Sequence, residues 1–108
     1  MAKGVVDETD PLALGMLGMF GTPYANMAIQ ENDCFIAVGV RWDDRVAEKV
    51  GFAIHAEIAY IDINAEKVRQ IRMERSPAFS YVGDAAYVFE DLARYAERQD
   101  VRLDIDEW

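Results

Sequence analysis

The sequence predicts an α/β protein with a three-layer, mainly parallel, Rossmann-like half-sheet of three main strands and flanking helices. Residues 34–40 form a continuous apolar run of strand length. Such a run is typical of a strand covered on both faces, as in a parallel sheet. Along the chain, the expected order is helix, strand, helix, strand, helix, strand, helix. Alternation of this kind favours a parallel, doubly wound sheet.

The amino-terminal part predicts a lead-in, a loop and a helix. Residues 1–14 carry Gly, Pro and acids without clear periodicity, and we interpret them as an extended lead-in. Residues 15–21, GMLGMFG, read as a glycine-punctuated loop. Thr22 is a good N-cap and Pro23 suits the first helical position, so a helix is expected over about 23–32.

The remaining strands and helices are predicted from changes between apolar and polar residues and from side chains that can cap a helix. A second strand is expected over about 57–63, and Asn64 is placed to cap a helix that runs to about Met73. A third, shorter strand is expected at 79–82. Gly83 and Asp84 then begin the clearest helix, whose apolar residues recur at helical spacing. These residues are Ala85, Val88, Phe89, Leu92, Tyr95 and Ala96.

Residues 99–108 form the carboxyl-terminal tail, which alternates acids with apolar side chains. The pattern fits either an added strand or a loose end.

Composition limits the classes of function. The 108 residues are expected to form a single domain, 1–108, and carry a net charge of -9. The eleven basic residues are scattered among twenty acids, which argues against binding a nucleic-acid backbone or a membrane surface. Residues 1–4 lead into acids, so no export signal is expected, and no apolar run has the length of a membrane span. With one cysteine and no disulfide, we predict a cytoplasmic protein.

Ligands of open α/β sheets gather at the carboxyl ends of the strands. The segments expected there are 39–45, 62–64 and 83–84. Their glycines allow close backbone approach, and their acids suit either ribose hydroxyls or helix caps. Both interpretations remain open on the residues alone.

Other patterns argue against catalysis by this chain. The loop at 15–21 reads G-x-x-G-x-x-G and lacks a preceding strand, so it fails the dinucleotide fingerprint. Asp43 and Asp44 are flanked by Arg41 and Arg45, which favours an Arg–Asp network. His55 has no recognisable nucleophile beside it, and one histidine with one distant cysteine makes a zinc site improbable. We therefore predict no catalytic residue and no metal ligand.

Three motifs carry a resemblance to a known family. Residues 15–46 read GMLGMFGTPYANMAIQENDCFIAVGVRWDDRV, and YIDIN and YVGDA follow in order with suitable gaps. Together they resemble the central domain of the acetolactate synthase (acetohydroxyacid synthase) catalytic subunit, a thiamine-diphosphate enzyme. The resemblance covers nearly all of residues 3–98. It implies a truncated fragment, the carboxyl-terminal half of that central domain.

In that family the central domain cradles FAD, so the resemblance implies FAD as the candidate cofactor. The residues that match flavin-side positions of the family are Met19, Phe20, Gly39, Val40, Arg41, Asp43, Arg45, Asp62, Ile63, Gly83 and Asp84. Four positions differ from the family pattern: Phe20 replaces a His, Trp42 a Phe and Asn64 an Asp, and Lys67 stands about where a flavin-side Glu is frequent. The family places its thiamine-diphosphate and magnesium sites in two other domains, so neither site is expected here.

Half a sheet would leave the apolar strand 34–40 at an exposed edge. We therefore expect a two-fold homodimer in which this strand pairs with its copy. Three classes of function follow from the resemblance. One is a non-catalytic flavin- or nucleotide-binding module. The second is a structural or interaction protein that has lost the ligand and binds an unknown partner. The third is a piece of an acetolactate synthase, in branched-chain amino acid biosynthesis, active only with the missing domains.

Overall fold

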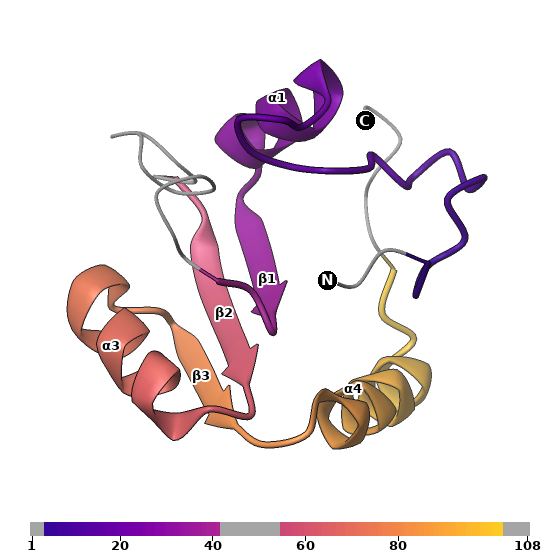
Figure 1. The fold of residues 1–108 in the computed structure, drawn as a ribbon. Coiled ribbons are helices and arrows are strands. Elements are labelled where there is room, and N and C mark those ends of the chain that lie inside the picture. The colour runs from indigo at the N-terminus through magenta and orange to yellow at the C-terminus, as the bar shows by residue number, and fades with distance from the viewer. Residues whose placement is uncertain (1–3, 42–54, 103–108) are drawn as a thin grey trace.

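The computed structural model describes residues 4–41 and 55–102, and Figure 1 shows their arrangement. Three strands form one parallel sheet in the order β1, β2, β3, which confirms the predicted parallel α/β half-sheet. In chain order the elements are α1 (Pro23–Glu31), β1 (Cys34–Val38), β2 (Glu57–Asp62), α3 (Ala65–Arg75), β3 (Phe79–Val82) and α4 (Ala85–Gln99). The helix expected between the first two strands lies outside the described residues.

The element ends differ slightly from the predicted ones, for local reasons. β1 ends at Val38 because Gly39 takes a φ of 61°, a left-handed conformation that interrupts the strand. β2 ends at Asp62, one residue earlier than expected. α3 continues to Arg75, past the expected Met73, and ends where Ser76 turns left-handed.

Each of the three described helices begins at a side-chain cap. The Thr22 hydroxyl accepts a hydrogen bond from the Ala25 amide at 3.2 Å, and Pro23 occupies the first turn as predicted. Asn64 accepts from the amides of Glu66 and Lys67. Asp84 accepts from the Ala86 amide at 2.9 Å. Side-chain caps satisfy amides that would otherwise lack a partner within the helix.

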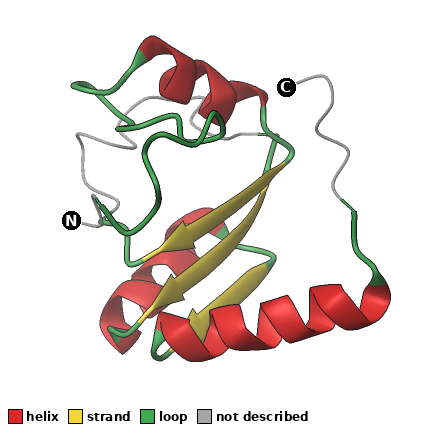
Figure 2. Cartoon of the chain, turned by 90° about the vertical axis from the view of Figure 1, so that its right-hand side faces the viewer, coloured by secondary structure: helices red, strands yellow, loops and turns green. Residues whose placement is uncertain are grey.

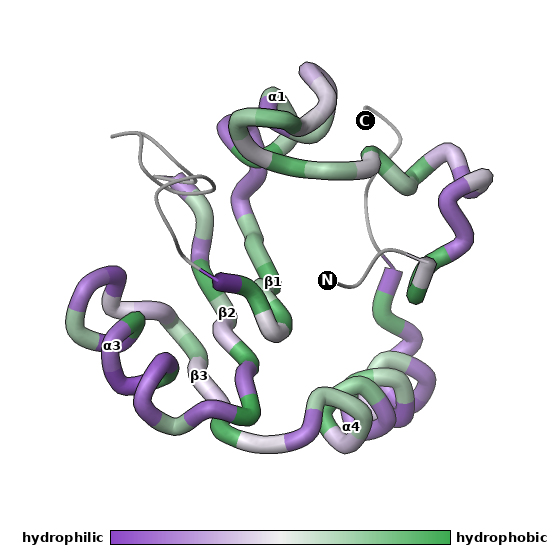
Figure 3. Tube along the Cα trace, viewed as in Figure 1, coloured by the Kyte–Doolittle hydropathy of each residue, from purple (hydrophilic) through white to green (hydrophobic). Residues whose placement is uncertain are grey.

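The hydrophobic core lies between α3 and one face of the sheet. Ala37 of β1 and Tyr60 of β2 are direct partners in the parallel register, and both are buried against Val68 and Ile71 of α3. Phe35 packs at the margin of this cluster. The hydropathy colours of Figure 3 show the strands mostly apolar and α3 mostly polar, consistent with a helix that buries one narrow stripe.

The other face of the sheet is open. Side chains alternate between the two faces of a strand, so Ile36, Phe79 and Tyr81 point away from α3. Ile36 and Phe79 are 50% and 52% exposed. α4 stands clear of the strands in Figures 1 and 2, and none of its residues is buried. Among the described residues, no helix is long and apolar enough to cross a membrane.

We predict that the core of α3 carries much of the stability. Ile71→Ala removes a 4%-exposed side chain from the cluster and should lower the free energy of unfolding by about 2–4 kcal/mol. Met73→Ala, on the same helix but 78% exposed, is the matched control and should change it by less than about 0.5 kcal/mol. Urea unfolding followed by circular dichroism measures both. Equal losses in the two variants would contradict the assigned packing of α3.

Candidate functional site

The three strands end at one edge of the sheet, and the backbone fixes how the ends lie. The Gly39 amide donates to the Ile61 carbonyl at 2.8 Å, and the Gly83 amide donates to the Asp62 carbonyl at 3.0 Å. These bonds continue the parallel ladders one residue past β1 and β3. Of the segments expected at this edge, the described parts, residues 39–41, 62–64 and 83–84, therefore follow strands that end side by side.

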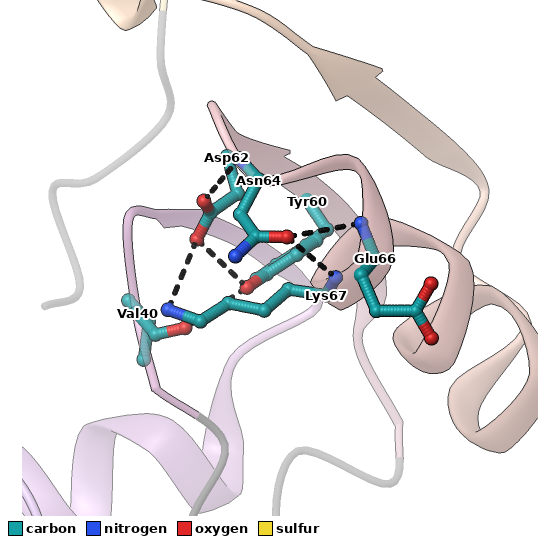
Figure 4. A network of polar contacts seen from close by, with 6 residues as sticks. All are labelled: Val40, Tyr60, Asp62, Asn64, Glu66 and Lys67. Atoms are coloured by element: carbon teal, nitrogen blue, oxygen red, sulfur yellow. Dashed lines mark hydrogen bonds and ion pairs between the residues drawn. The ribbon is translucent and has the colours of Figure 1, made fainter.

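A buried tyrosine lies beneath this edge (Figure 4). Tyr60 is fully buried, and its hydroxyl lies 2.9 Å from the Val40 carbonyl and 3.1 Å from Oδ2 of Asp62. Both partners are acceptors, so the single hydroxyl proton is shared between them. The bond to Val40 holds the segment after β1 against β2.

Asp62 is the buried carboxylate of the edge, at 6% exposure. Its Oδ1 accepts from the Asn64 amide at 2.8 Å, and its Oδ2 lies 3.9 Å from the Lys67 ammonium. Both carboxylate oxygens therefore have partners within the chain. A buried carboxylate needs such partners because desolvation penalises its charge.

Burial and this carboxylate act together on the phenol. Desolvation is the larger cause, and the negative charge of Asp62 adds to it, so that the pKa of Tyr60 rises to about 12. The hydroxyl is therefore protonated, and acts as a hydrogen-bond donor, throughout the neutral range.

The described part of the edge carries two cations, Lys67 and Arg41, and three carboxylates, Asp62, Glu66 and Asp84. The Lys67 side chain is 41% exposed, so its ammonium borders both Asp62 and solvent. Arg41 directly follows the segment that Tyr60 holds, and it is exposed. Lys67 also lies in the first turn of α3, where the amide dipoles favour an anion. The exposed part of the Lys67 ammonium can therefore pair with a negatively charged group from solvent.

The two glycines of the edge differ in their surroundings. Among the described residues, no atom lies within 4 Å of the point where a side chain of Gly39 would begin, and Gly39 itself is exposed. A Cβ on Gly83 would lie 2.5 Å from the Tyr81 ring, so that glycine is closely covered. The open part of the edge is therefore near β1 and the start of α3.

Met19 and Phe20 lie elsewhere. Their loop is bound to α1, since Asn26 donates to the Gly18 carbonyl at 3.0 Å and accepts from the Gly18 amide at 2.9 Å. α1 leads into the amino end of β1, and Figure 1 shows both at the opposite end of the strand from Gly39. Met19 and Phe20 are 69% and 74% exposed. The structure does not bring them to the carboxyl edge.

The other predicted site residues are placed as follows. Ile63 is exposed, and Asp84 is engaged as the cap of α4. Asp43 and Arg45 lie outside the described residues. Within residues 4–41 and 55–102, no group of three or more His, Cys, Asp or Glu side chains could hold a metal ion. The flavin contacts assigned to these positions stay predictions.

Sequence reasoning missed two residues of this geometry. Tyr60 was interpreted only as an apolar residue of a strand. Its position two residues before Asp62 could have shown that the two side chains lie on the same face of that strand. Asn26 gave no signal, because the seven residues between it and Gly18 follow no common motif. Lys67 was noted only for its charge, and its approach to Asp62 depends on the crossover from β2 to α3.

A parallel sheet whose strands alternate with helices defines the α/β class of domain. Residues 1–92 match the model of the thiamine pyrophosphate enzyme central domain, and the chain belongs to this family. The match with the acetolactate synthase large subunit of Pyropia yezoensis is 43% identical over 93 residues, covering 85% of this chain and 15% of that protein. The acetolactate synthase of Arthrospira platensis is 48% identical over 96 residues, covering 85% and 16%. The chloroplastic acetolactate synthase of Arabidopsis thaliana is 37% identical over 111 residues, covering all of this chain and 16% of that protein. The chain thus spans about one sixth of these relatives, and the resemblance found from the motifs is confirmed.

We predict that the Tyr60 hydroxyl stabilises the edge. Tyr60→Phe leaves the Val40 carbonyl and one oxygen of Asp62 without their donor, and should cost about 1–3 kcal/mol of unfolding free energy. Tyr87→Phe, on an exposed residue of α4, is the matched control and should be nearly neutral. Urea titration of both variants measures the difference, and an unchanged midpoint for Tyr60→Phe would show that the hydroxyl contributes nothing.

The raised pKa of Tyr60 also predicts a pH dependence. The unfolded tyrosine loses its proton near pH 10, whereas the folded one holds it to about 12. Above pH 10 the unfolded state therefore binds fewer protons, and the stability associated with Tyr60 falls as the pH rises from 10 to 12. Tyr60→Phe should show a shallower fall over this window than the wild type in urea midpoints. Parallel curves would contradict the assignment.

Proposed function

We propose that this chain is a flavin-nucleotide-binding module that does not catalyse a reaction by itself. The observation that carries the proposal is the part of the carboxyl edge where Gly39 is exposed and the half-buried Lys67 ammonium borders solvent. An anionic group such as a diphosphate would be attracted to the Lys67 ammonium and to the first turn of α3. Membership of a thiamine pyrophosphate enzyme family supports a nucleotide-like cofactor, and the resemblance to acetolactate synthase favours FAD.

Two residues of the edge would serve different roles toward a flavin nucleotide. Lys67 would pair with a phosphate oxygen, exchanging part of its interaction with Asp62 at 3.9 Å for a closer partner. Gly39 would allow the nucleotide to approach the backbone, since no atom in the described part of the chain lies within 4 Å of its side-chain position. Tyr60 and Asp62 would hold these groups in place from beneath and would not contact the ligand.

A second candidate is an interaction protein that has lost the ligand. The exposed apolar side chains of the glycine loop and α1 favour it, because clustered exposed apolar groups mark binding surfaces. These side chains are Met16, Met19, Phe20, Tyr24 and Met27, each more than half exposed. Failure to bind FAD would favour this candidate. Restored acetolactate synthesis on adding the amino- and carboxyl-terminal domains of a relative would instead favour a piece of an enzyme.

We predict saturable binding of FAD to the purified chain, seen as quenching of flavin fluorescence together with a raised melting temperature. Lys67→Gln removes the ammonium and should weaken binding about tenfold. Arg72→Gln is the matched control, because Arg72 is an exposed cation in the last turn of the same helix. Its affinity should equal that of the wild type.

Two outcomes would contradict the proposal. Absence of binding at FAD concentrations well above those of cells would exclude a flavin module. Equal weakening by Lys67→Gln and Arg72→Gln would show that overall charge, and not this edge, attracts the nucleotide.

A further inference from the structure

Two apolar surfaces of this chain remain exposed. One is the face of the sheet opposite α3, called here the open face. The side chains of the open face are Ile36 and Val38 of β1, Ala59 and Ile61 of β2, and Phe79 and Tyr81 of β3. The other is the apolar stripe of α4. Its members are Ala85, Val88, Phe89, Leu92, Tyr95 and Ala96.

Both surfaces are apolar enough to need a cover. Ile61 at the middle of the open face is 1% exposed, whereas Ile36 and Phe79 on the strands beside it are about half exposed. On α4, Leu92 is 46% and Tyr95 61% exposed. An amphipathic helix and a bare sheet face are the two surfaces that α/β proteins pack against each other. Left in water, each is an aggregation hazard.

Local contacts direct α4 away from the open face of its own chain. Only Gly83 and Asp84 connect β3 to the helix. The Gly83 amide is bonded to the Asp62 carbonyl at 3.0 Å, and the Tyr81 ring closely covers the Gly83 backbone. The Asp84 side chain caps the first turn. These contacts fix the direction in which the helix leaves the sheet, and Figure 2 shows it extending to one side of the strands.

We propose that the open face binds α4 of a second copy of this chain, in a reciprocal two-fold dimer. Each copy has one exposed apolar helix and one exposed apolar sheet face. A two-fold axis would therefore bury both surfaces of both chains. The exchange leaves the connection at Gly83 as it is. It places the apolar stripe of α4 on a partner's Ile36, Phe79 and Tyr81.

The exposed area suits a stable dimer. The aromatic side chains Phe79, Tyr81, Phe89 and Tyr95 are each 40–61% exposed, and a buried aromatic contributes roughly 150–250 Å². With Ile36 and Leu92 added, each chain offers several hundred square ångströms of apolar side chain. A standard interface buries about 800 Å² on each partner. The two surfaces together therefore approach what a specific dimer needs, whereas either alone falls short.

This dimer differs from the strand-paired dimer expected from the sequence. β1 is at an edge of the described sheet, so pairing with a copy of itself would cover its backbone. That arrangement would leave the stripe of α4 in water. Substitutions in α4 therefore separate the two arrangements.

The test is sedimentation of purified chains across micromolar concentrations. Leu92→Lys places a charge in the stripe and should raise the dissociation constant of the dimer more than about a hundredfold. Because Leu92 is not buried within one chain, circular dichroism should show the helices intact. Glu97→Lys puts the same side chain on the exposed, polar side of α4 and should leave the dimer unchanged.

A mixing experiment tests the exchange itself. Ile36→Lys should also give monomers, because it places a charge in the apolar open face. A mixture of Ile36→Lys and Leu92→Lys chains retains one intact helix–face contact per pair, so part of the dimer should return. No heterodimer in that mixture, a wild-type monomer at every concentration, or a Leu92→Lys dimer as stable as the wild type would each overturn the proposal.

Discussion

The bond from the Tyr60 hydroxyl to the Val40 carbonyl is the interaction on which the candidate site depends. It connects the core beneath α3 to the segment after β1. The same hydroxyl reaches Asp62, whose other oxygen holds the start of α3 through the Asn64 amide. One buried tyrosine thus links the segment after β1 to the end of β2, in addition to the backbone bonds between these strands. The positive charge of Lys67 is presented at the surface because this network fixes the first turn of α3.

The second constraint is that the two faces of the sheet are covered unequally. α3 covers one face and, in the described part of the chain, supplies two of the buried residues of the core, Val68 and Ile71. The open face and α4 each keep large apolar side chains in water. A small parallel sheet gains much of its stability from cover on both sides. The nucleotide binding and the chain pairing that we propose would therefore be separate properties: one would belong to the carboxyl edge, the other to the open face.

Family membership and chain geometry contribute different parts of the functional argument. The match over residues 1–92 gives the class of domain. It does not say what a chain spanning 15% of a relative binds or does. The geometry adds that both carboxylate oxygens of Asp62 have partners inside the chain. Lys67 and Gly39, in contrast, are partly or fully exposed to solvent. A ligand would therefore meet a cation and a bare backbone at this edge, with the carboxylate behind them.

The sequence by itself determined the strands, the caps and the family. Thr22, Asn64 and Asp84 act locally on the amides that follow them, and the apolar run at 34–40 is long enough to specify a strand without help from the rest of the chain. Only the tertiary structure decided which side chains meet. The separation of Phe20 from Gly39 and the approach of Lys67 to Asp62 depend on how α1 and α3 are placed around the strands. Such contacts join residues through crossovers, and the spacing of residues along the chain carries no record of that geometry.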